Sequence, residues 1–96
     1  MTITNKNDAN KATVLAALTA VRSALQNEPD SAQRSQALQQ CDRLELAIGQ
    51  YHAEGLRFAA FTLLKMVQSP GTPFTDPVHV ATRGLKQALE TAGYPH

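Results

Sequence analysis

Apolar residues recur at every third or fourth position in three stretches of the chain, which is the pattern of amphipathic helices. In the first stretch, Asp8 is a good N-cap residue. Pro29 ends this stretch, because the residue before a proline is displaced from the helical conformation. The pattern predicts a helix over about 8–27, preceded by a disordered segment, residues 1–7. The apolar stripe of this helix consists of Val14, Leu18, Val21 and Leu25.

The second stretch is the longest. Asp30 or Ser31 can cap its start, with Gln33 placed as in a capping box. The next proline along the chain is Pro70, and one three-four spacing runs through the whole interval. The simplest prediction is therefore a single helix over about 31–68. The members of this stripe are Cys41, Leu44, Ile48, Tyr51, Gly55, Phe58 and Thr62.

Two glycines in the middle of that stretch leave an alternative open. Gly49 and Gly55 would each cost a helix interior about 1 kcal/mol relative to alanine, so a break between them is the competing interpretation. The segment between the glycines contains no Asn, Asp, Ser or Pro, which interhelical turns usually carry. The continuous helix is therefore the main prediction.

A loop rich in Pro, Gly and Thr separates the second stretch from the third. Asp76 followed by Pro77 predicts an N-cap and a first helical residue, and Gly93 fits a left-handed residue that closes the helix. The third helix is thus expected over about 76–92. Its apolar face is formed by Val78, Ala81, Leu85, Ala88, Leu89 and Ala92.

These lengths predict an all-α fold in which one long central helix is covered by two short antiparallel helices, in a single domain over 8–96. The central helix would be roughly 57 Å long, whereas a compact chain of this size has a radius of gyration of about 12 Å. Eight of the ten residues 58–67 are also apolar, more than one covering layer needs. A homodimeric helical bundle, with coiled-coil packing, is therefore expected. Its predicted interface is Leu56, Phe58, Ala60, Phe61, Leu63 and Val67.

Charge and composition narrow the classes of partner. Nine Lys and Arg against eight Asp and Glu give a formal net charge of +1, and the two signs are interspersed. Nucleic acid and membrane surfaces are therefore not expected as partners, since both require a concentrated basic field. No apolar run is long enough for a targeting or spanning segment, so the expected location is the cytoplasm. The one cysteine, Cys41, lies on an apolar stripe and is expected to be a buried, reduced thiol.

The centre of the second stretch holds the strongest candidate site. Tyr51, His52, Glu54 and Arg57 cluster there, where the start of the first helix and the end of the third would also meet. Free N–H groups at a helix start, together with His52 and Arg57, could receive a small anion or carboxylate. The plainer interpretation is that this region only packs helices, with Glu54 and Arg57 forming a surface ion pair.

Catalytic and metal chemistry have little support in the sequence. No two histidines are spaced for a shared metal on a helix, so neither a metal site nor a cofactor is predicted. Cys41 would lie roughly 16 Å from His52 along a helix, too far for a thiol–imidazole pair. The expected function is a small, non-enzymatic protein–protein interaction module, an adaptor, chaperone or regulator. It is expected to act as a homodimer, with another protein as an optional second partner. The alternative is a bundle that binds a small molecule or anion through residues 51–57.

Overall fold

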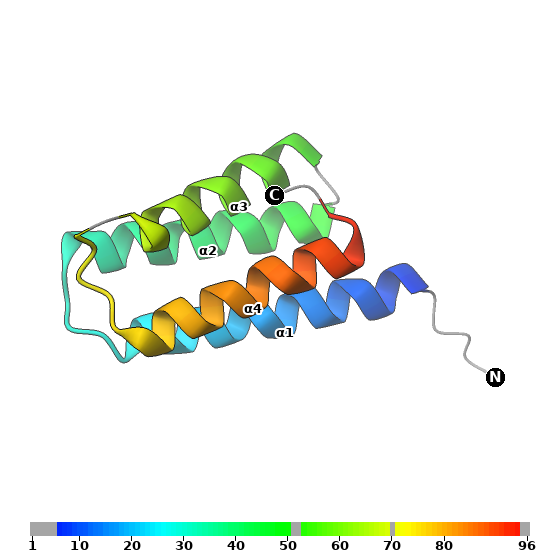
Figure 1. The fold of residues 1–96 in the computed structure, drawn as a ribbon. Coiled ribbons are helices and arrows are strands. Elements are labelled where there is room, and N and C mark those ends of the chain that lie inside the picture. The colour runs from blue at the N-terminus through cyan, green and yellow to red at the C-terminus, as the bar shows by residue number, and fades with distance from the viewer. Residues whose placement is uncertain (1–5, 51–52, 70, 95–96) are drawn as a thin grey trace.

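The computed structural model describes residues 6–50, 53–69 and 71–94, with side chains from Asn10 onward, and folds this part of the chain into four helices (Figure 1). Successive helices run in opposite directions, as short connections require. The first packs against the last and the second against the third, while the third and fourth make the least contact of the neighbouring pairs. The helices are α1 (Lys6–Gln26), α2 (Ala32–Gln50), α3 (Ala53–Gln68) and α4 (Asp76–Ala92).

The prediction of one central helix over 31–68 is wrong. Helix α2 ends at Gln50 and α3 begins at Ala53, so the break lies between the two glycines of the competing interpretation. Helix α3 folds back on α2 and buries the side chains of Leu56 and Leu63 inside the same chain. Burial of this apolar surface compensates for the backbone hydrogen bonds that a continuous helix would have made.

The length of the predicted central helix was one reason to expect a dimer, and that reason no longer holds because the long helix does not exist. The Cα radius of gyration is 13.3 Å and the principal extents are 48 × 24 × 18 Å, as a compact chain of this length requires. The predicted three-helix arrangement is thus replaced by four helices packed as a bundle within one chain. Each helix contributes one apolar face to a common core.

The predicted stripes of the first and last helices are confirmed. All four members of the α1 stripe are buried, and Val78, Leu85 and Leu89 of α4 are fully enclosed. The long stripe is confirmed only up to Ile48. Beyond the break the burial pattern differs from the predicted stripe, because Phe58 is exposed and other apolar residues of α3 face the core. These residues are Leu56, Ala60, Leu63 and Val67.

Local capping explains where the helices begin and end. Ser31 caps α2 as predicted, its Oγ accepting a hydrogen bond from the backbone N–H of Arg34 at 3.0 Å. Gly93 closes α4 in the left-handed conformation, with φ of 75°. One predicted start is wrong, because α1 begins at Lys6, before Asp8. The predicted bounds of the last helix are confirmed by α4, but its N-cap is Thr75 and not Asp76.

Arg34 joins the end of α1 to the start of α2. Its guanidinium donates hydrogen bonds to the carbonyl oxygens of Leu25 at 3.0 Å and Gln26 at 3.4 Å. Carbonyl groups in the last turn of a helix have no partner within the helix, so this arginine satisfies groups that α1 leaves open. A second arginine, Arg22, reaches from α1 to Asp42 and Glu45 of α2 at 3.1 and 3.0 Å.

Glu28 connects the α1–α2 loop to the start of α4. Its Oε1 accepts hydrogen bonds from the backbone N–H and the hydroxyl group of Thr75, at 2.6 and 2.7 Å. The Thr75 hydroxyl therefore donates to Glu28 and makes no capping bond to its own helix. These hydrogen bonds, and the charge of His79, lower the pKa of the Glu28 carboxyl below its ordinary value of 4.5.

This shift predicts an acid-sensitive contribution to stability. The folded pKa lies below the unfolded value, so the unfolded chain takes up the Glu28 proton first as the pH falls below 4.5. The stabilising contribution is complete above that pH and is lost as the pH falls through the folded pKa. Urea unfolding between pH 3 and 6 should show a steeper loss for the wild type than for Glu28→Gln. Equal slopes would contradict the role of this carboxylate.

Candidate functional site

Three large apolar side chains form an exposed ridge across α2 and α3. The exposed fractions are 61% for Leu46, 64% for Phe58 and 55% for Phe61. Leu46 and Phe58 line one hollow of about 230 Å³ between the two helices, and Phe58 and Phe61 line another of about 360 Å³. Each member thus lies beside the next, and we call Leu46, Phe58 and Phe61 the exposed ridge.

The bundle gives α3 two apolar faces and covers only one. Leu56, Ala60, Leu63 and Val67 fill the core, and the two phenylalanines lie on the opposite side of the helix, at a spacing of three residues. Exposed aromatic rings are costly in water and are enriched in protein interfaces. The ridge therefore holds three of the four large apolar side chains that are exposed on the described surface.

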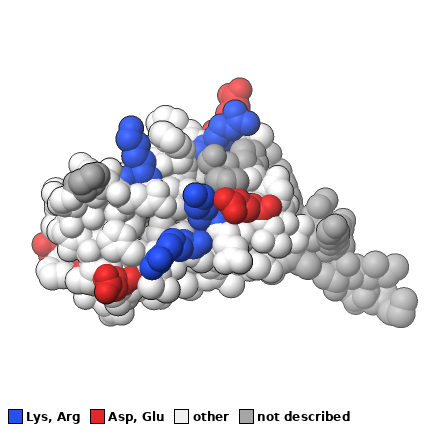
Figure 2. Space-filling view, in the orientation of Figure 1, with Lys and Arg blue, Asp and Glu red and all other residues white. Residues whose placement is uncertain are grey.

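Charged side chains border the exposed ridge. Arg43 shares the hollow of Leu46, and Glu54 and Arg57 share the hollow of the two rings. Lys65 places its Nζ 5.6 Å from the centre of the Phe61 ring, a cation–π contact. Figure 2 shows basic and acidic side chains interspersed over α3 and α4 on the side turned to the viewer. The border is therefore mixed in charge.

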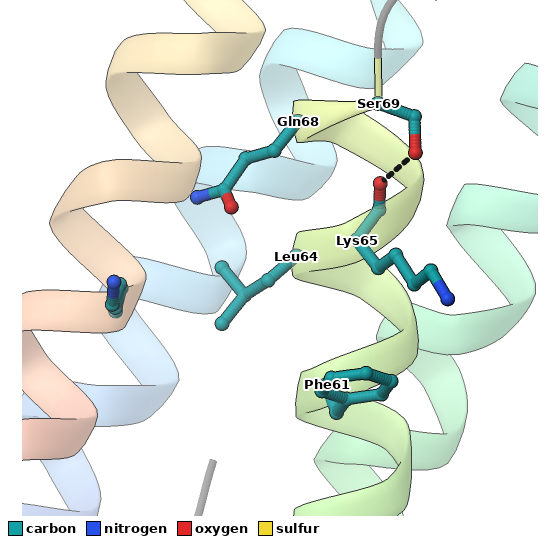
Figure 3. A pocket seen from close by; sticks show the side chains of 6 residues that line it. Phe61, Leu64, Lys65, Gln68 and Ser69 are labelled. Carbon is teal, nitrogen blue, oxygen red and sulfur yellow. Dashed lines mark hydrogen bonds between the residues drawn. The ribbon is translucent and has the colours of Figure 1, made fainter.

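A shallow groove runs along the line where α3 and α4 meet. It has a volume of about 440 Å³, and Phe61, Lys65 and Lys86 are among the residues that line it. Leu64 and Gln68 point from α3 toward α4, whereas Lys65 points away from it (Figure 3). The groove exists because α3 and α4 make little contact. It extends the exposed ridge toward α4.

The predicted anion site is only partly within the described residues. Tyr51 and His52 lie outside them. Glu54 and Arg57 are both exposed on α3, and no ion pair joins them among the pairs that the described residues form. Figure 1 places the start of α1, the ends of α2 and α4 and the start of α3 at one end of the bundle. The described part shows an open surface and no enclosed anion pocket.

Four of the six residues predicted to form a dimer interface are placed in the core. The exposed fraction is 3% for Leu56 and zero for Ala60, Leu63 and Val67, because the other helices of the same chain cover them. Phe58 and Phe61 are the two members that reach the surface. Of the six predicted interface residues, Phe58 and Phe61 are therefore the two that another molecule can contact.

Leu46 was not expected at the surface site. It lies between Leu44 and Ile48, which both face the core, and so it is out of phase with the stripe of α2. An isolated leucine on the polar face of an amphipathic helix was the available signal. Its significance depends on Phe58, which comes beside it only because α3 folds back on α2.

Cys41 and the metal-ligating residue types are the remaining groups with chemical potential. Burial raises the pKa of the Cys41 thiol to about 11, which makes it a poor nucleophile. In residues 6–50, 53–69 and 71–94, no three His, Cys, Asp or Glu side chains come together as a metal site requires. No helix in those ranges has the length and apolar content to cross a bilayer.

The fold and the surface together define a small four-helix up-and-down bundle with an exposed aromatic face. No protein-family model, curated protein or solved structure matches this chain. Its function must therefore be inferred from the surface that the bundle presents.

Proposed function

We propose that this chain is a small, non-catalytic helical interaction module that acts as a homodimer through the exposed ridge. The observation that carries the proposal is the exposure of Phe58 and Phe61, at 64% and 55%, side by side on one helix. Large exposed apolar groups that adjoin one another mark interaction sites on soluble proteins, whereas single ones are ordinary. Val80 on α4, 58% exposed, is such a single residue.

The mixed charge border supports a protein as the partner. Arg57 and Glu54 flank the same two rings, and an apolar centre with a polar rim is the usual anatomy of a protein interface. A nucleic-acid surface would need more concentrated positive charge than a chain of net charge +1 provides. In this role the module would act as an adaptor, chaperone or regulator, in the cytoplasm, with a second protein bound to the dimer as a further element of the proposal.

Sedimentation equilibrium at micromolar concentration tests this function. We expect a mass near twice 10.4 kDa for the wild type, and a mass near 10.4 kDa for Phe58→Ala/Phe61→Ala. The double variant should keep its helical circular dichroism, because both side chains lie outside the core. Val80→Ala is the matched control: it removes an equally exposed apolar side chain and should remain dimeric. A monomeric wild type would refute the proposal.

A further inference from the structure

Four exposed side chains of α3 are spaced symmetrically about one point on the helix. Phe58 and Phe61 are at its centre, Glu54 lies four residues before the first ring, and Lys65 lies four residues after the second. All four side chains are exposed. The midpoint between the two phenylalanines falls between residues 59 and 60, and so does the midpoint between Glu54 and Lys65. Opposite charges therefore lie about 8 Å on either side of one point on the helix axis.

The exposed side of α3 is complementary to a second copy of α3 that runs in the opposite direction. A half-turn about an axis that crosses α3 at the midpoint brings Phe58 opposite the partner's Phe61 and Glu54 opposite the partner's Lys65. The spacing of four, three and four residues is that of the alternating seam positions of a coiled coil. Two copies can thus satisfy both the apolar and the charged positions with one surface, as a two-fold interface requires.

Resting on the proposed function, we propose that two copies of this chain pair α3 against α3 in antiparallel orientation, with each Glu54 forming an ion pair with the partner's Lys65. The pairing is about a two-fold axis between residues 59 and 60. It would place the four phenylalanine rings in one cluster, closed at both ends by an ion pair. The occupant of the exposed ridge is therefore a second copy of the chain.

The charges oppose the parallel arrangement. Parallel pairing would bring each Glu54 opposite the partner's Glu54, and each Lys65 opposite the partner's Lys65, which is repulsive at both ends. In the antiparallel arrangement Arg57 falls opposite the partner's Thr62, so no two cations meet there. An unrelated acidic helix would be attracted by Lys65 but repelled by Glu54. An antiparallel second copy of α3 instead places an opposite charge beside each of these two residues.

The hollows beside the rings fit this arrangement. The space of about 360 Å³ lined by Glu54, Arg57, Phe58 and Phe61 lies where a ring of the partner would enter. On the α2 side, the hollow of about 230 Å³ that Leu46 and Phe58 line provides a second recess. Ring side chains that enter recesses between opposing side chains give the interlocked packing of paired helices. The exposed ridge then supplies both projections and recesses.

Charge reversal tests the pairing of Glu54 with Lys65. Glu54→Lys and Lys65→Glu should each raise the dimer dissociation constant by about tenfold at low ionic strength, because each variant makes both ion pairs repulsive. The double variant should recover an affinity near the wild type. Asp30→Lys is the matched control, since its side chain is 88% exposed in the α1–α2 connection and its charge changes equally. It should leave the dissociation constant unchanged.

Cysteine cross-linking tests the direction of the helices independently. In a Cys41→Ala background, oxidation of a mixture of Glu54→Cys and Lys65→Cys chains should give the mixed covalent dimer. Glu54→Cys alone should not cross-link, because antiparallel pairing separates the two copies of residue 54 by about 16 Å, beyond the reach of a disulfide.

The possible failures are distinct. A monomeric wild type refutes the proposed function and this inference together. A dimer that depends on Phe58 and Phe61, but shows no recovery in the double charge reversal and cross-links through residue 54 alone, refutes the antiparallel pairing and leaves the proposed function standing. A chain that stays monomeric but binds an acidic helical peptide through Lys65 would show that the exposed ridge serves a foreign partner, and so also overturns the pairing.

Discussion

Replacing Leu63 by alanine should lower the free energy of unfolding by about 2–5 kcal/mol, the range for removing a buried leucine. Leu63 has no exposed surface and is among the largest fully buried side chains of the chain. The loss combines the transfer free energy of the missing methyl groups with the cavity that they leave. Because a domain of this size has a total stability of only about 5–15 kcal/mol, the change should be plain in urea unfolding followed by circular dichroism.

Phe61→Ala is the matched control for that experiment. Phe61 lies two residues earlier on the same helix, but its side chain is 55% exposed, and exposed substitutions usually change stability by less than about 0.5 kcal/mol. Both variants should be measured at low protein concentration, where self-association adds nothing to stability. Equal losses for the two variants would contradict the orientation of α3.

Chemical modification of Cys41 should be slow while the chain is folded. Burial raises the pKa of its thiol from the ordinary 9.0 to about 11, which alone lowers the reactive thiolate fraction near neutral pH by about a hundredfold. Enclosure in the core, with no exposed surface, slows the reaction further. Labelling with a disulfide reagent at pH 8 should therefore be at least about a hundredfold slower in buffer than in concentrated urea.

A cysteine on the surface supplies the comparison. Ser23 lies on the exposed side of α1, so Ser23→Cys in a Cys41→Ala background should react as fast in buffer as in urea. If native Cys41 reacted as quickly as that residue, its burial between helices would be disproved. The same result would reopen a chemical role for the thiol.

The sequence predicts those features that local patterns determine. The stripe from Val14 to Leu25 and the cap at Ser31 depend on spacing and on side-chain hydrogen bonding within a few residues. The left-handed closure at Gly93 depends on the freedom of glycine at positive φ. Such features are independent of where the other helices lie.

The break in the second stretch could not be decided in this way. A continuous stripe predicts a helix, but the spacing alone does not say which side of α3 will be buried after the chain turns. Leu56 and Leu63 compete with Phe58 and Phe61 for the core, and the choice depends on how α3 contacts the rest of the bundle. For the same reason, the sequence does not identify Leu46 as part of the exposed ridge, because its neighbour Phe58 belongs to a different helix.

The pairing of α1 with α4 has a consequence for how the bundle forms. Helices α2 and α3 are joined directly and can close as a local hairpin, whereas α1 and α4, the two helices most distant along the chain, pack together most extensively. Their contact requires closure of the whole intervening chain, with its entropic cost. The hairpin is therefore expected to form first, and the α1–α4 contact should complete folding in one cooperative step.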